Sequence, residues 1–137
     1  NPTSPKGPLN KIASGGELSR ISLAIQVITA QVAAIPTVVF DEIDVGIGGA
    51  TAEIVGQLLK ALGKRSQVLC VTHQPQVASQ GDHHIRVKKT GSKTKLTTSL
   101  EPLEDNQKIE EIARMLGGIA ITENTLAHAR EMLGIRH

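Results

Sequence analysis

The sequence almost lacks aromatic side chains, since it has no tryptophan, no tyrosine and one phenylalanine, Phe40. Aromatic rings are the side chains that usually anchor protein interfaces and stack on unpaired bases. Their scarcity argues against binding of single-stranded nucleic acid through a stacking platform. Valine, isoleucine, leucine and alanine supply nearly all of the hydrophobic residues, and a core of these types suits a sheet covered by helices.

Cysteine is equally scarce, and with Cys70 alone no disulfide can form within the chain, which favours a reducing compartment. No apolar run approaches the roughly 20 residues that a membrane-spanning helix needs, and residues 1–9 lack the hydrophobic segment of a signal peptide. The formal charge of +2, from 15 basic and 13 acidic residues, is too small to indicate nucleic-acid binding. We therefore expect a cytoplasmic protein without a membrane partner, long enough for one hydrophobic core.

The first part of the chain predicts a strand–helix–strand unit preceded by a long helix. Residues 1–10 hold three prolines and are expected to be an irregular lead-in. Apolar residues surround a narrow polar stripe from Gly16 to Val32, which predicts a helix buried on most sides. The apolar runs Thr37–Phe40 and Val68–Val71 predict strands covered on both faces, and Ile54–Leu62 predicts the helix between them. This order is typical of a parallel sheet.

The second part of the chain predicts a hairpin followed by two helices. The stretches His84–Lys89 and Lys95–Leu100 alternate in polarity and flank Thr90–Ser92, which we take as the turn. Helical spacing of apolar residues recurs at Ile109–Leu116 and Leu126–Leu133, each followed by glycine. The expected fold class is α/β, with a mainly parallel sheet, flanking helices and a peripheral hairpin.

Three short motifs carry chemistry, and the first, Ser14-Gly15-Gly16-Glu17-Leu18-Ser19-Arg20, stands where the long helix begins. A helix start offers unpaired backbone N–H groups and the positive end of the helix dipole, and glycines let an anion approach closely. The motif predicts a phosphate-binding helix start. A serine cap followed by a glycine turn is the plainer alternative.

The second motif is an apolar strand, Thr37–Phe40, that ends in two adjacent carboxylates, Asp41 and Glu42. Ligands of open parallel sheets bind beyond the carboxyl ends of the strands, where such a pair would lie. Neighbouring side chains point different ways there, so Asp41 could hold a hydrated Mg²⁺ while Glu42 faces an attacking water. The alternative is a pair of acids in a solvated loop.

The third motif, Val71-Thr72-His73-Gln74, again follows a buried strand. It places His73 at the edge of the sheet that carries Asp41 and Glu42. A single histidine in this position can serve as a structural residue or contact a phosphate. Its order and spacing after the other two motifs favour the phosphate contact.

Together these motifs resemble those of the ABC ATPase family, whose signature sequence, Walker B strand and switch histidine follow in this order. The resemblance covers residues 11–73 and assigns Ser14–Gln26 to the signature and its helix. It assigns Val38–Glu42 to Walker B with the catalytic glutamate, Asp44 to the D-loop and His73 to the switch position.

Within that family the chain resembles RecN, an SMC relative that acts in bacterial DNA double-strand-break repair and recombination. The resemblance rests on the loop Glu42-Ile43-Asp44-Val45-Gly46-Ile47-Gly48-Gly49 and on two stretches near the end, Ile112–Gly118 and Ala127–Leu133. Transporters commonly carry Ser-Ala-Leu-Asp in this loop. Two other interpretations remain, the tail half of a transporter ATPase and an interaction module that never completes a site.

The sequence has no P-loop, because Gly91-Ser92-Lys93-Thr94 lacks the glycines of that motif. The resemblance implies that the P-loop lies in an amino-terminal half, beyond long coiled-coil arms, and that residues 1–137 form the carboxy-terminal lobe of an ATPase head. The chain alone would then be inactive. Two heads would clamp two ATP molecules between them, and the full-length protein would meet DNA on the nucleoid.

The resemblance also implies a role for each site residue. Ser14, Gly15, Gly16 and Glu17 would bind nucleotide held by the opposite head, with Asp44 at the seam between heads. From the chain's own head, Asp41 would hold Mg²⁺, Glu42 would polarise the attacking water and His73 would steady the γ-phosphate of ATP. Because phosphoryl transfer depends mainly on positioning and charge stabilisation, hydrolysis would require both heads.

Two further features have alternative interpretations. Five basic residues crowd the predicted hairpin and could contact a DNA backbone, although a solvated edge that discourages strand pairing is the interpretation we favour from sequence; they are Arg86, Lys88, Lys89, Lys93 and Lys95. Cys70 and the histidines at 73, 83 and 84 suggest zinc, but their spacing fits no common ligand pattern.

Overall fold

The computed structural model describes residues 15–135, with side chains from residue 20 onward. The predicted lead-in at residues 1–10 therefore lies outside the described residues, as does Ser14. By its internal contacts the chain divides into two compact units, residues 1–77 and residues 78–137.

The first unit contains the predicted strand–helix–strand arrangement. Helix α2, Gly15–Ala33, leads into strand β1, Thr37–Phe40, and helix α3, Gly49–Leu62, connects β1 to strand β2, Gln67–Cys70. The two strands are parallel, with Thr37 opposite Gln67 and Phe40 opposite Cys70. The four predicted elements are thus confirmed, with β2 beginning and ending one residue earlier than expected.

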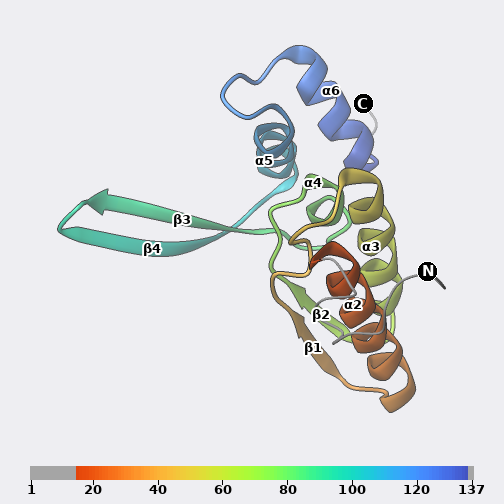
Figure 1. Cartoon of the computed structure of the whole chain (residues 1–137). Coiled ribbons are helices and arrows are strands. Elements are labelled where there is room, and N and C mark those ends of the chain that lie inside the picture. Colours follow the sequence, from red (N-terminus) through yellow and green to blue (C-terminus); the bar gives the residue numbers. More distant parts are fainter. Residues whose placement is uncertain (1–14, 136–137) are drawn as a thin grey trace, which may run out of the picture. The chain divides into compact units, whose positions relative to one another are not determined.

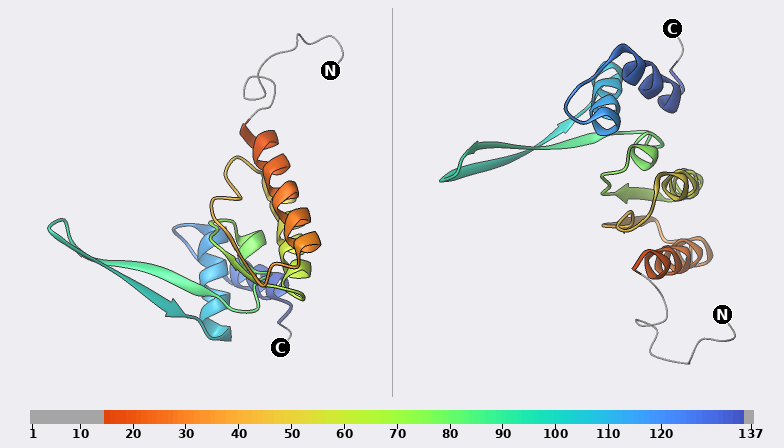
Figure 2. Two further views of the ribbon diagram at one scale, coloured as in Figure 1. Left: turned by 90° about the horizontal axis from the view of Figure 1, so that it is seen from below. Right: turned by 45° about the horizontal axis from the view of Figure 1, so that its top comes forward.

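Both long helices of this unit lie on the same side of the two-stranded sheet (Figures 1 and 2). The register pairs Val38 with Val68 and Phe40 with Cys70, and these four side chains form the face that packs against the helices. Phe40, the largest of them, is fully buried. The core that they join consists of Leu23, Val27, Ala30, Ile43, Ile47, Ala52, Val55, Leu59, Leu62 and Val77.

The opposite face of the sheet is open, so the prediction of strands covered on both faces is wrong for this chain. Val39 and Leu69 are partners in the register, and their side chains are 62% and 48% exposed. Helix α2 likewise buries one face instead of most sides, since Ile25, Ile28 and Val32 are exposed. An apolar run predicts strand or helix, but it does not specify which residues cover each face.

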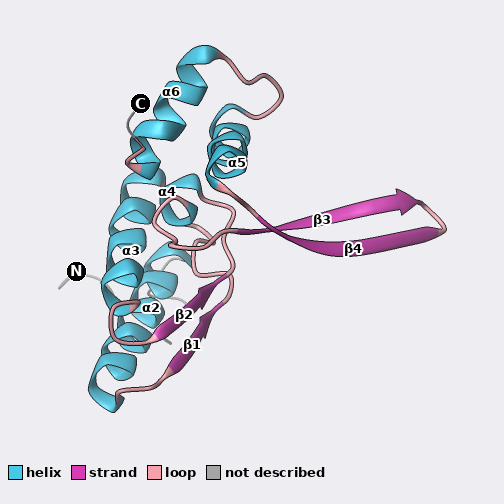
Figure 3. Ribbon diagram, turned by 180° about the vertical axis from the view of Figure 1, so that it is seen from behind, coloured by secondary structure: helices cyan, strands magenta, loops and turns pink. Residues whose placement is uncertain are grey.

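The second unit consists of a hairpin and two helices. Strand β3, Ile85–Ser92, pairs antiparallel with strand β4, Lys95–Pro102, and the ribbon extends away from helices α5, Asp105–Gly117, and α6, Glu123–Leu133 (Figure 3). The two helices share a small core of buried residues, namely Ile109, Ile112, Ala113 and Ala129. Both predicted helices and the predicted hairpin are confirmed. A short helix across the unit boundary, α4 at Pro75–Ala78, was not predicted.

The turn of the hairpin lies later than the sequence suggested. The strands remain paired up to Ser92 and Lys95, so the turn residues are Lys93 and Thr94 and not Thr90–Ser92. Gly91 is instead a strand residue with a φ of 121°, and a Cβ there would stand 1.9 Å from the carbonyl oxygen of Lys95. Glycine is needed here for a close backbone approach and not for the turn itself.

No helix in residues 15–135 combines the length and the apolar character that crossing a membrane requires.

Candidate functional site

The residues that follow β1 and β2 meet at one edge of the parallel sheet. Because the strands run parallel, the carboxyl end of each points the same way, and the loops beyond them share a hollow of about 260 Å³. We call it the edge hollow. Its lining consists of Asp41, Glu42, Asp44, Val45, Val71, Thr72 and His73. The predicted carboxylates and the predicted histidine are therefore brought together.

Asp44 ties the two loops to each other. Its side chain is 2% exposed, and Oδ2 accepts hydrogen bonds from the Thr72 hydroxyl and from the backbone N–H groups of His73 and Gln74, at 2.8 and 3.1 Å. A buried carboxylate requires such donors, because an unpaired charge in the interior is costly. The loop after β1 thus fixes the course of the chain after β2.

These contacts determine the ionisation of Asp44. Burial alone would raise its pKa, but the Thr72 hydroxyl and the His73 backbone N–H together hold the pKa below its ordinary value of 3.8. Asp44 is therefore ionised at neutral pH, as an acceptor of several hydrogen bonds must be.

His73 is anchored at one nitrogen and open to solvent elsewhere. Its Nδ1 lies 3.2 Å from Oδ2 of Asp44, while 71% of its side chain is exposed. The contact keeps Nδ1 close to an ionised carboxylate. The ring is thereby oriented, and Nε2 is left for a ligand of the edge hollow.

Asp41 and Glu42 are exposed at the same hollow. Within the described residues neither carboxylate forms a hydrogen bond or an ion pair, in contrast to Asp44. Glu42 has a φ of 55°, in the left-handed region that costs a side chain about 1 kcal/mol and that is enriched at functional sites. The two unpaired carboxylates make this edge negative and suited to a cation.

The carboxylates fit magnesium only if other ligands complete its shell. Among the described residues, no three histidine, cysteine, aspartate or glutamate side chains are grouped closely enough to hold a metal by themselves. Mg²⁺ usually takes one or two carboxylates together with phosphate oxygens and water. Asp41 therefore suits a cation that arrives with a phosphate ligand.

Cys70 has the properties of a core residue rather than a ligand. Its side chain packs against the core of the first unit. Burial, followed by the charges of Asp44 and Asp41, raises the pKa of the thiol to about 11. Because zinc binds the thiolate, this environment disfavours the zinc site that Cys70 and the histidines suggested.

The first turn of α2 begins where the signature motif predicted it. Gly15, Gly16 and Glu17 have helical backbone, so the N–H groups of this turn are those of a helix start. Ser14 lies outside the described residues. The contact of this turn with a nucleotide stays a prediction.

Sequence reasoning missed three contributions to the site. It placed Asp44 at a seam between heads, which stays a prediction, and did not foresee that donors of its own chain occupy the carboxylate. It assigned no role to Thr72, which binds Asp44, or to Gln74, whose Nε2 donates to the carbonyl of Ile47 at 3.2 Å. The only available signal was that two polar residues flank His73 directly after a strand.

The sequence matches those of known proteins. The family model described as "RecF/RecN/SMC N terminal domain" matches residues 9–95. The chain is 56% identical over 133 residues to the DNA repair protein RecN of Vibrio cholerae, covering 97% of this chain and 24% of the relative. The chain thus spans about a quarter of the length of that curated relative.

Solved structures show the same fold. The SMC head domain from Thermotoga maritima matches with a TM-score of 0.56 and 26% identity, over 69% of this chain and 34% of the head. An SMC ATPase described for ATP-driven dimerization and DNA-stimulated activation matches with a TM-score of 0.65 and 21% identity, over 80% of this chain and 66% of that one. With its α/β architecture of an SMC head, the chain belongs to the RecF/RecN/SMC family.

Proposed function

We propose that the chain is the carboxy-terminal half of the ATPase head of a RecN-like DNA double-strand-break repair protein. In the full-length protein it binds and hydrolyses ATP with Mg²⁺. The observation that carries this proposal is the edge hollow, where two unpaired carboxylates and an oriented histidine meet at the carboxyl ends of parallel strands. The family to which the chain belongs supports the same assignment.

Each residue of the edge hollow has a distinct task in this proposal. Asp41 is one ligand of Mg²⁺, which neutralises charge on the phosphates when it is bound. Glu42 accepts a hydrogen bond from the attacking water and draws electron density toward its oxygen. Through Nε2, His73 contacts the γ-phosphate of ATP. Since the site works by positioning and charge stabilisation, small shifts of these groups reduce the rate.

Asp44 acts in this site as a positioning residue. It touches neither water nor phosphate in the proposal, but its Oδ2 holds the ring of His73 and the backbone on either side of it. A role at the seam between heads remains compatible with this position, but it would come from the shape of the loop, because the carboxylate already accepts three hydrogen bonds.

A second head completes the site in this proposal. The start of α2, with Ser14, Gly15, Gly16 and Glu17, faces nucleotide held by the other head, because a helix start attracts phosphate. The remaining partners are the amino-terminal half of the same head and, through the full-length protein, DNA on the nucleoid in the cytoplasm. A related SMC ATPase that is described for ATP-driven dimerization supports such an assembly.

The substitution Glu42→Gln in the full-length protein tests the proposal. Glutamine keeps the size of the side chain but cannot draw the proton of the attacking water, so ATP-dependent head association should persist while steady-state hydrolysis falls by about 100-fold or more. The matched control is Glu53→Gln on α3, an exposed position, which should leave the rate near that of the parent. Hydrolysis at the parent rate in Glu42→Gln would refute the assignment of Glu42.

A further inference from the structure

The hairpin β3–β4 carries a concentrated positive charge. Residues 85–102 contain five basic residues and one acidic residue, a formal charge of +4 in a chain whose total is +2. No aspartate or glutamate occurs between Asp82 and Glu101. The small net charge of the chain therefore conceals a segment whose field attracts polyanions.

The register sorts the side chains of the hairpin onto two different faces. Side chains alternate along each strand, so cross-strand partners share a face. One face is mainly apolar and exposed, with Ile85, Val87, Leu96 and Leu100 on it. The other, which we call the basic face, consists of Arg86 with Glu101, Lys88 with Ser99, Thr90 with Thr97, and Ser92 with Lys95.

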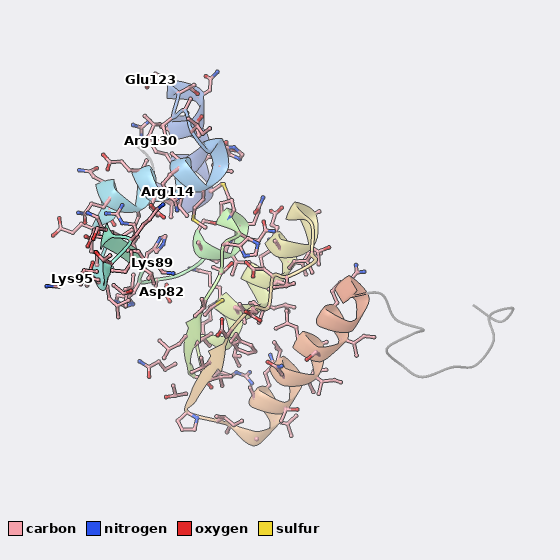
Figure 4. All side chains as sticks on the ribbon, turned by 60° about the vertical axis from the view of Figure 1, so that its left-hand side comes forward. Asp82, Lys89, Lys95, Arg114, Glu123 and Arg130 are labelled. Carbon is pink, nitrogen blue, oxygen red and sulfur yellow. The ribbon has the colours of Figure 1, made fainter. Side chains whose placement is uncertain are left out.

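The chemistry of the basic face changes along its length. At its base Arg86 donates to Glu101 at 2.6 Å and is balanced by it. Lys88 lies 3.6 Å from the same glutamate and is half-exposed. Toward the turn, Lys95 and Lys93 form no ion pair among the described residues. Lys95 and Lys89 lie on opposite sides of the ribbon (Figure 4).

The base of the hairpin is held to α5, which fixes how the ribbon leaves its unit. Glu111 is 5% exposed, and it accepts hydrogen bonds from Arg114, at 2.6 and 3.0 Å, and from Arg86, at 3.5 Å. The hydrogen bond from Arg114 in particular lowers the pKa of Glu111, against the effect of burial. Glu101 and Glu111 are thus engaged at the base, and the outer part of the basic face keeps its charge.

We propose that the basic face of the β3–β4 hairpin binds the phosphate backbone of double-stranded DNA. Lysines bind phosphates as point charges, and serine and threonine hydroxyls donate to phosphate oxygens; the outer basic face presents both kinds of group side by side. This proposal depends on the proposed function in one respect, namely that the polyanion is taken to be DNA.

The test compares salt dependence of DNA binding by the full-length protein and by its double variant Lys88→Gln/Lys95→Gln, without ATP. Loss of two phosphate contacts should reduce the slope of log affinity against log salt by about 1.8, so that the advantage of the parent over the variant shrinks about 12-fold between 50 and 200 mM salt. The control Lys64→Gln/Arg65→Gln removes the same charge beyond α3 and should keep the parent slope.

Two outcomes would overturn the proposal. A slope that equals the parent's in Lys88→Gln/Lys95→Gln, or one that falls equally in the control, would show that the basic face makes no specific contact with DNA. If the double variant instead loses binding of polyglutamate and keeps the DNA slope, the face binds an acidic polypeptide. Nucleotide binding and basal hydrolysis, measured in parallel, should match the parent, so failure of this proposal is separable from failure of the ATPase assignment.

A matched pair of cysteine variants tests the face itself. Ser99 and Thr98 are adjacent, exposed and on opposite faces. With a photoreactive group attached to the introduced thiol, Ser99→Cys should crosslink to duplex DNA several-fold more than Thr98→Cys. Equal crosslinking from both positions would contradict the assignment of the basic face.

Discussion

The substitution Asp44→Ala tests how the site is held together. In the parent, the N–H of His73 donates to the Asp44 carboxylate at 2.8 Å, and it has no other acceptor within the described residues. A hydrogen bond to a charged group contributes about 1.5–3 kcal/mol net. Because the His73 side chain is exposed and water can replace part of the contact, we expect the lower value, about 1.5 kcal/mol, or roughly tenfold in an equilibrium constant.

The measurement is hydrogen–deuterium exchange of the full-length protein without nucleotide, resolved within residues 71–76. The His73 amide should exchange about tenfold faster in Asp44→Ala, since local opening costs less free energy. The Gln74 amide should change less, because the Thr72 hydroxyl accepts from it at 3.0 Å. The control Asp41→Ala removes a neighbouring exposed carboxylate that holds no part of this loop.

The pH dependence follows from the lowered pKa of Asp44. A carboxylate whose pKa is lower in the folded than in the unfolded protein stabilises the fold above its ordinary value of 3.8 and loses that contribution as pH falls through the folded value. Protection of the His73 amide, corrected for intrinsic exchange, should therefore be equal at pH 7 and pH 5. An unchanged exchange rate in Asp44→Ala would refute the account of Asp44 as the anchor of the loop.

Two other predictions follow from the structure and the proposal. Cys70, with its pKa raised to about 11, should react with iodoacetamide at pH 7.5 at least tenfold more slowly than a free thiol of ordinary pKa, because the thiolate is the reactive form; rapid labelling of the folded protein would contradict the buried position. Ser14→Arg should abolish hydrolysis by blocking the contact between heads while a single head still binds nucleotide in an equilibrium titration. Loss of that binding would count against a contact between heads.

The sequence predicted the elements better than their environment. Strands at Thr37–Phe40 and near Val68 could be recognised because β-branched apolar runs bounded by turns are distinctive. The exposure of Val39 and Leu69 could not be predicted. Hydrophobicity indicates that a face tends to be covered, but it does not indicate which segment covers it. The position of the hairpin turn was missed because Gly91 resembles a turn residue, whereas its lack of a Cβ serves the close approach to Lys95.

In the site, too, the positions of the residues could be predicted from the sequence but their contacts could not. The edge that brings Asp41, Glu42 and His73 together follows from parallel strand order alone, and it could be stated in advance. The burial of the Asp44 carboxylate could not be predicted. It depends on the backbone course of two loops and on the donors that converge on the carboxylate. The basic face of the hairpin also needed the register, since alternation sorts Lys88 and Lys95 from Lys89 only once the partners are known.

The central claim is that one site is shared by two heads, and mixing two inactive variants of the full-length protein tests it directly. In a mixed pair of Ser14→Arg and Glu42→Gln heads, one site would combine an intact Ser14 with an intact Glu42, and the other would carry both defects. If the variants exchange freely in a symmetric pair, the mixture should recover about a quarter of the parent hydrolysis rate, although neither variant is active alone. A mixture as inactive as its components would contradict the claim.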